Sequence, residues 1–116
     1  MSKKIFFIHG LSGGKKTWEH FKNIIKQDAE LKEFILLEYS YPTILFKILP
    51  WTILPKIQAI VDGLKSEINI KTDKKDDVIL IAHSMGGLIA RKYLVEEFKN
   101  KKQIQVRKVI LFATPN

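Results

Sequence analysis

The sequence places one serine in a setting that suits nucleophilic catalysis. The segment Ala82-His83-Ser84-Met85-Gly86 has the form small-x-Ser-x-Gly and lies between an apolar run and an amphipathic stretch. This context is typical of a nucleophile elbow, a sharp strand-to-helix turn that exposes the serine hydroxyl. Ala82 and Gly86 are small enough for the positions that such a turn presses against neighbouring backbone. We predict that Ser84 is the nucleophile and that the amide of Met85, at the helix start, stabilises an oxyanion.

A second loop with suitable chemistry follows the first apolar run of the chain and reads His9-Gly10-Leu11-Ser12-Gly13. If the first and third strands are neighbours in a parallel sheet, this loop lies beside Ser84 at the carboxyl edge of the sheet, where such folds bind ligands. The amide of Leu11 is then the second oxyanion donor. The residues expected to support the site are His9, Gly10, Ala82, His83 and Gly86.

The histidines have more than one interpretation. His9 has the chemistry of a general base, but we favour a role in shaping its loop by hydrogen bonding. His83 lies inside the turn, and its side chain is expected to point away from the Ser84 hydroxyl. His20 is expected to be exposed on the first helix, and Trp18 to be a core or pocket-wall residue. Because small-x-Ser-x-Gly is common by chance, the prediction depends on the strand before it, the helix after it and the His-Gly loop.

The elements that must position these residues are visible as four short apolar runs. Each run is continuous rather than alternating, which favours strands buried on both faces of a parallel sheet. The runs cover residues 5–8, 34–39, 78–82 and 109–113.

Three amphipathic stretches separate the strands and predict helices. Thr17 is a candidate cap for the first helix, and Pro55 suits the first turn of the second. A stripe of apolar residues marks the buried face of each helix. These residues are Trp18, Phe21, Ile24 and Ile25; then Ile57, Ile60, Val61, Leu64 and Ile68; then Leu88, Ile89, Tyr93, Leu94 and Phe98.

The predicted order is therefore β-α-β-α-β-α-β within a single domain, residues 1–116. Strands that alternate with helices imply a parallel sheet covered on both faces. We expect an α/β three-layer sandwich with a four-stranded parallel sheet, in strand order 2-1-3-4.

Composition narrows the function classes. The chain has no cysteine, which excludes a disulfide framework and a thiolate metal site, and we expect no metal and no cofactor. The net charge of +8 comes almost entirely from scattered lysines, which favours a solvated surface over a nucleic-acid partner. Because no secretory signal and no transmembrane run is visible, the expected location is cytoplasmic.

One further segment, from Thr43 to Leu54, is apolar all round and contains Pro50. It is interpreted either as the buried approach to the second helix or as a flap or acyl-chain wall near the site.

At these motifs the sequence resembles the α/β-hydrolase superfamily, and it looks most like the lipase and serine-esterase branch. The resemblance covers the His-Gly loop, the serine turn with Ala82 in place of the usual glycine, and a last strand that ends in Thr-Pro. It implies attack by Ser84 on the carbonyl of a small-molecule or lipid ester, an acyl-enzyme, and its hydrolysis by water. The implied oxyanion donors are the amides of Leu11 and Met85.

The sequence departs from this family in one major respect. In the family a catalytic acid and then a histidine follow the serine, but no histidine follows His83 here, and the only later acids are Glu96 and Glu97. The chain is therefore expected to lack the family's C-terminal strands. Residues 109–113 would then form an exposed apolar edge that self-associates or binds a missing C-terminal part.

Three other functions remain open at this point. A thioesterase or an amidase can use the same scaffold, because a fold does not fix the bond that is cleaved. The chain can also be a catalytically inactive fragment or binding module that keeps the serine turn. A flavodoxin-like nucleotide-binding domain is disfavoured, because the first loop lacks a Gly-x-Gly-x-x-Gly pattern.

Overall fold

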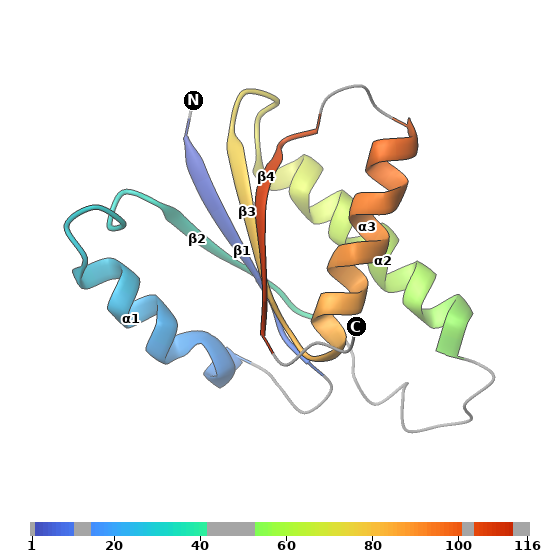
Figure 1. Cartoon of the computed structure of the whole chain (residues 1–116), viewed down its shortest axis with the longest axis horizontal. Coiled ribbons are helices and arrows are strands. Elements are labelled where there is room, and N and C mark those ends of the chain that lie inside the picture. The colour runs from blue at the N-terminus through green and yellow to red at the C-terminus, as the bar shows by residue number, and fades with distance from the viewer. Residues whose placement is uncertain (1, 11–14, 42–52, 101–103, 113–116) are drawn as a thin grey trace.

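The computed structural model of the chain describes residues 2–10, 15–41, 53–100 and 104–112. Strands and helices alternate along them, as predicted (Figure 1). In chain order the elements are β1 (Lys3–Ile8), a 3-10 turn (Lys15–Trp18), α1 (Glu19–Gln27), β2 (Ile35–Tyr39), α2 (Ile53–Lys71), β3 (Asp77–His83), α3 (Met85–Asn100) and β4 (Val106–Phe112).

The four strands form one parallel sheet in the order β2-β1-β3-β4, which confirms the predicted fold class and strand order. The last residues of neighbouring strands are paired with one another. Ile8 pairs with Tyr39 of β2 and with Ala82 of β3, and Ala82 pairs with Leu111 of β4. The residues that follow all four strands therefore lie along one edge of the sheet.

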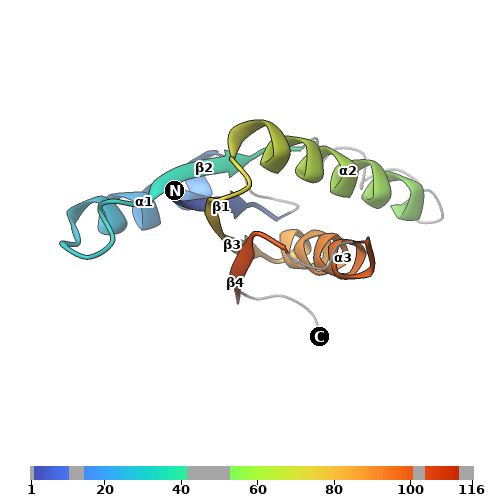
Figure 2. The same ribbon diagram turned by 90° about the horizontal axis from the view of Figure 1, so that it is seen from above.

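Helices cover the sheet unequally on its two faces. Seen from above, α2 and α3 lie on one face and α1 lies on the other (Figure 2). The larger core lies on the α2–α3 side and includes Phe6, Ile8, Leu64, Leu80 and Ile89. The smaller core, on the α1 side, consists of Ile5, Phe7, Trp18, Ile25 and Ile81.

The predicted apolar stripe of α2 faces the core. Ile57 is partly buried there, and the other four residues are buried: Ile60, Val61, Leu64 and Ile68. The prediction for α3 was wrong at Phe98, which is 67% exposed, whereas Glu97 is buried. The buried positions of α3 begin at Gly86 and Gly87 and continue through Ile89, Ala90 and Tyr93 to Glu97. Because glycines bring the start of the helix close to the sheet, they set its rotation and turn Phe98 outward.

The prediction for α1 was also partly wrong. Trp18 and Ile25 are buried, but Phe21 and Ile24 are 37% and 53% exposed. The helix begins at Glu19, and its N-cap residue is Trp18 rather than the predicted Thr17. The 3-10 turn before α1 moves the helix start two residues beyond the predicted cap.

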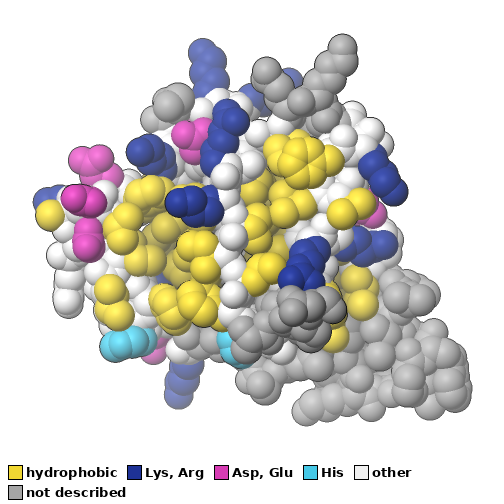
Figure 3. All heavy atoms as spheres, viewed as in Figure 1, with side chains coloured by type: hydrophobic (Ala, Val, Ile, Leu, Met, Phe, Trp, Pro, Cys, Tyr) yellow, Lys and Arg dark blue, Asp and Glu magenta, His cyan; other side chains and the backbone are white. Residues whose placement is uncertain are grey.

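Strand β4 is an edge strand in the part of the chain that the structure describes. It starts at Val106, three residues earlier than predicted, and an irregularity interrupts its pairing between Val78 and Ile79. Ile110 and Phe112 are 37% and 38% exposed. Apolar side chains gather on both sides of the β4 backbone (Figure 3).

Two sequence features lie wholly or largely outside the described residues. Of the segment Thr43 to Leu54, only the last two residues are described, as the start of α2, so neither of its interpretations is tested. Leu11 also lies outside the described segments. Within those segments, no helix has both the length and the apolar character that crossing a bilayer requires.

Candidate active site

Ser84 has the backbone conformation that a nucleophile elbow requires. It lies between the end of β3 and the start of α3, and its φ is 54°. It is the only residue other than glycine with a positive φ in the described segments. Such a conformation costs on the order of 1–3 kcal/mol and persists only where surrounding contacts impose it.

Two backbone hydrogen bonds hold this turn. The Ser84 N–H donates to the carbonyl oxygen of Phe112 on β4, at 2.9 Å, and the Gly87 N–H donates to the carbonyl oxygen of Ser84, also at 2.9 Å. Met85 is the first residue of α3, so its amide belongs to the turn whose N–H groups have no partner within the helix. The positive end of the helix dipole lies at the same place.

The described part of the first loop, His9 and Gly10, meets the serine turn. A Cβ atom placed on Gly10 would lie 2.8 Å from the Cβ of Ser84 and 3.1 Å from the His83 carbonyl oxygen. A Cβ on Gly86 would lie 2.5 Å from the Ile8 carbonyl oxygen and 2.7 Å from that of His9. Both positions therefore require glycine, and the ends of β1 and β3 touch through these two residues.

His9 is buried and makes contacts at both ring nitrogens. Its Nδ1 lies 2.8 Å from the Gly10 carbonyl oxygen, and its Nε2 accepts a hydrogen bond from the Tyr41 N–H at 3.3 Å. Because Nδ1 faces an acceptor and Nε2 faces a donor, the ring must be the tautomer that carries its proton on Nδ1. With its basic lone pair engaged by Tyr41, the ring is not free to take a proton from Ser84.

The other two histidines occupy different surroundings. The His83 ring lies edge-on to the Trp18 ring, with centroids 6.4 Å apart, and Trp18 itself is 2% exposed. Trp18 also packs on Phe7, at 5.1 Å between centroids. His20 is exposed on α1. Within the described segments, no side chain hydrogen-bonds to the Ser84 hydroxyl.

The two late acids are far from the turn. Glu96 and Glu97 follow the first residue of α3 by 11 and 12 positions, which places them about 16–18 Å along the helix from it. Glu96 forms an ion pair with Lys65 on α2, at 3.8 Å. Neither acid is therefore placed to orient a base beside Ser84. No group of three metal-ligating side chains occurs in the described part of the chain.

Sequence reasoning missed Tyr41. This residue follows the carboxyl end of β2, at the same edge of the sheet as His9 and Ser84, and its ring stacks on His9 with centroids 4.3 Å apart. Its hydroxyl donates to the His9 carbonyl oxygen at 2.6 Å. The available signal was its position just beyond the second predicted strand.

The parallel sheet and the serine turn together define an α/β-hydrolase-type scaffold. Residues 52–116 match a family model described as the PGAP1-like alpha/beta domain, and this match covers more than half of the chain. The chain belongs to this family, a serine-hydrolase-like α/β family. The matched residues include the serine turn but not the His9–Gly10 loop, which the fold brings to the same place. A search of curated proteins gave no match.

Proposed function

We propose that the chain is a serine hydrolase of carboxylic esters in which Ser84 is the nucleophile. The observation that supports this most strongly is the strained Ser84 conformation, with Gly10 in contact at one side and the start of α3 at the other. An ordinary strand-to-helix connection has no need of a positive φ at a serine. Nucleophile elbows do, because the turn must expose the hydroxyl.

In this proposal the Ser84 oxygen attacks the ester carbonyl carbon. The carbonyl π electrons move to the oxygen, and the amides of Met85 and Leu11 stabilise the resulting oxyanion. Collapse of the tetrahedral intermediate expels the alcohol and leaves an acyl-enzyme, which water hydrolyses. A base takes the Ser84 proton and returns it to the departing alkoxide. Because no described side chain is hydrogen-bonded to the Ser84 hydroxyl, we propose that this base comes from outside the described segments.

The test is labelling of the purified chain with a fluorophosphonate probe, beside the Ser84→Ala variant. We expect label on the wild-type chain and none on the variant, because the probe reacts with activated serines. Ser12→Ala, which changes a serine in the other loop, is a matched control and should leave the labelling of Ser84 intact. Equal labelling of the wild-type and Ser84→Ala chains would contradict the assignment of Ser84.

A second candidate is a binding module that keeps the serine turn without its chemistry. The observation in its favour is that none of the described side chains is hydrogen-bonded to the Ser84 hydroxyl. A wild-type chain that takes no label would support this alternative. If the chain is labelled, turnover of matched oxygen esters, thioesters and amides distinguishes an esterase from a thioesterase or an amidase.

We also propose self-association through β4, whose outer edge is open in the described structure. Antiparallel pairing centred on Val109 would place Arg107 and Lys108 of one copy opposite apolar residues of the other, which keeps like charges apart. Sedimentation velocity over a range of concentrations should show a dimer, and Ile110→Lys should abolish it, because a charge on an edge strand opposes pairing. Monomers at every concentration would refute this proposal. The cytoplasmic location remains a prediction, which imaging of the tagged chain can test.

A further inference from the structure

Tyr41 contacts the His9–Gly10 segment in three ways at once. Its hydroxyl donates to the His9 carbonyl oxygen, its backbone N–H donates to His9 Nε2, and its ring stacks on the imidazole at an angle of 7°. The two side chains are 6% and 5% exposed. Side-chain hydroxyl, backbone and ring thus fix both the position and the tautomer of His9.

The hydroxyl of Tyr41 is a stable donor. Burial is the main cause that raises the pKa of Tyr41 well above its usual range, and the neighbouring Tyr39 is the second cause. The hydroxyl therefore keeps its proton at any pH at which an ester hydrolase works. Its acceptor, the His9 carbonyl, is also one of the two carbonyls against which Gly86 packs.

The His9 imidazole in turn restrains the carbonyl group of the next residue, Gly10. His9 Nδ1–H donates to the Gly10 carbonyl oxygen at 2.8 Å. Gly10 packs directly on the serine turn, because a Cβ atom on it would lie 2.8 Å from the Cβ of Ser84. A hydrogen bond that fixes the Gly10 carbonyl therefore also fixes where the His9–Gly10 segment lies against Ser84.

We propose that Tyr41 is a positioning residue for the serine turn: by clamping His9 it orients the Gly10 carbonyl and holds Gly10 against Ser84, at the start of the loop that carries the proposed oxyanion donor, the amide of Leu11. This inference rests on the proposed serine hydrolase function. It assigns Tyr41 no contact with substrate. Its effect is on the transition state, through the position of Gly10 beside Ser84.

The first arm of the test is NMR of the whole chain, which needs no catalytic activity. In the wild-type protein, long-range 1H–15N spectra of the His9 ring should show a proton on Nδ1, and the amide of Leu11 should give one sharp signal. Tyr41→Phe removes one hydrogen bond, and Tyr41→Leu also removes the ring stack. Both should populate a second His9 tautomer and broaden or split the Leu11 amide, Tyr41→Leu more strongly.

The matched control is Tyr39→Phe. Tyr39 is another buried tyrosine, two residues away, and its hydroxyl donates to the Ile60 carbonyl oxygen on α2 at 2.7 Å. This variant loses the same type of bond but should leave the signals of His9 and Leu11 unchanged. Circular dichroism and melting temperature identify any variant that has simply failed to fold.

The second arm measures the rate of fluorophosphonate labelling at Ser84. For Tyr41→Phe we expect kinact to fall by about tenfold to a hundredfold with KI unchanged, because a misdirected donor weakens the transition state and not the initial complex. The pH dependence of labelling should stay the same, since the base is not affected. A general loss of structure would instead raise KI or abolish labelling.

The outcomes separate the two proposals. His9 and Leu11 signals that do not respond to Tyr41→Phe or to Tyr41→Leu would overturn the clamp, whatever the labelling. A response in the spectra with an unchanged kinact would overturn its role in catalysis. If the wild-type chain takes no label, the proposed hydrolase function fails and the catalytic role of Tyr41 fails with it, whereas the NMR arm still tests the clamp itself.

Discussion

At Gly63 a hydroxyl group occupies the space that a methyl group would need. A Cβ on this residue of α2 would collide with the Tyr39 hydroxyl oxygen. That hydroxyl reaches past Gly63 to the carbonyl oxygen of Ile60, one turn earlier in the helix. Burial, with Glu67 as a second cause, raises the pKa of Tyr39 to about 12, so the hydroxyl remains a donor. The glycine thus allows α2 and β2 to be joined by a buried hydrogen bond.

A double-mutant cycle measures this coupling. Gly63→Ala alone should lower the free energy of unfolding by about 1–2 kcal/mol, because the cost of overpacking exceeds the gain in helix propensity. Tyr39→Phe alone should cost about 1 kcal/mol for the lost hydrogen bond. In the Tyr39→Phe background, Gly63→Ala should become neutral or stabilising, because the clashing atom is gone. Urea unfolding of the four proteins checks this, and additive effects would contradict the contact.

The sequence predicted which loops meet at the candidate site, but not all of their contacts. Gly86 followed from the demand of a sharp turn for small neighbours, and Gly10 from the His-Gly loop after the first predicted strand. The structure places Gly10 against Ser84 and Gly86 against the end of β1. Tyr41 was missed because its part in the site depends on the pairing of β1 with β2. No local pattern encodes that a tyrosine beyond one strand stacks on a histidine beyond another.

At the scale of elements, strands were easier to predict than the orientation of helices. Continuous apolar runs fix a buried strand whichever way it faces, and all four were found to within a few residues. A helix must also choose its rotation. In α3 the stripe Leu88, Ile89, Tyr93, Leu94, Phe98 is a plausible face, but the close approach at Gly86 rotates the helix so that Glu97 is buried.

The apolar residues of α1 show a second reason for such errors. Phe21 and Ile24 lie on the expected side of the helix but remain exposed. The Phe21 ring lies 5.3 Å from that of Phe112 on β4, which is itself 38% exposed. Periodicity indicates which side of a helix is apolar, and it does not indicate how much of that side finds a partner.

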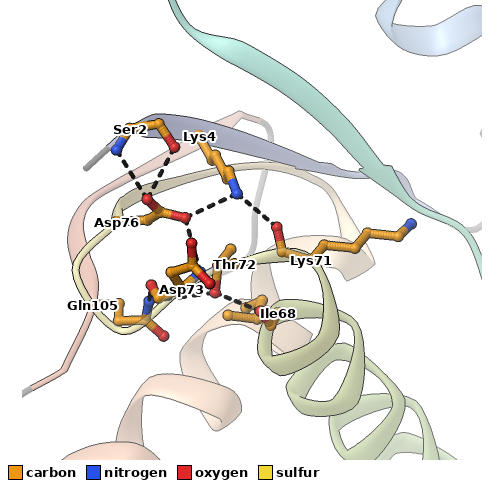
Figure 4. Close-up of polar contacts among 8 residues, drawn as sticks. All are labelled: Ser2, Lys4, Ile68, Lys71, Thr72, Asp73, Asp76 and Gln105. Atoms are coloured by element: carbon orange, nitrogen blue, oxygen red, sulfur yellow. Dashed lines mark hydrogen bonds and ion pairs between the residues drawn. The ribbon is translucent and has the colours of Figure 1, made fainter.

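At the scale of the whole molecule, a polar cluster joins the elements at the edge of the sheet opposite Ser84 (Figure 4). The Asp76 carboxylate is buried and accepts hydrogen bonds from the Ser2 N–H and hydroxyl, both at 2.9 Å, and from the Asp73 N–H, also at 2.9 Å. It forms an ion pair with Lys4 at 2.8 Å. Gln105, before β4, bonds to Thr72 and Asp73 after α2. One carboxylate thus organises the starts of β1 and β3 and the end of α2.

The contacts of Asp76 predict a pH dependence of stability. Lys4 is the main cause that holds the pKa of the Asp76 carboxyl well below its usual range. The hydrogen bonds from the amides of Asp73 and Ser2 lower it further. Because the pKa is lower in the folded than in the unfolded chain, the stabilisation is complete above about pH 4 and is lost as the pH falls below that value. Asp76→Asn should therefore lower the urea midpoint at neutral pH and reduce the further loss of stability on acidification.

Urea unfolding of the wild-type and variant chains between about pH 7 and pH 3 checks this. The matched control is Asp73→Asn, because Asp73 is exposed and gives the cluster only its backbone groups. It removes the same charge and should change the midpoint little. If the two variants lose equal stability at neutral pH, net charge and not the buried carboxylate is responsible.

The bond from the Ser84 N–H to the Phe112 carbonyl has a consequence for how the protein folds. Every pair of strands in this sheet is parallel, so each pairing waits for the closure of a long loop, and such contacts form slowly. The serine turn gains this acceptor only when β4 has docked on β3. Until then its left-handed conformation carries strain without that bond to offset it. The reactive geometry is thus a product of the assembled sheet and is not a property of the five-residue motif, so a nascent chain that has made only the first three strands does not yet present this serine as a fully formed elbow.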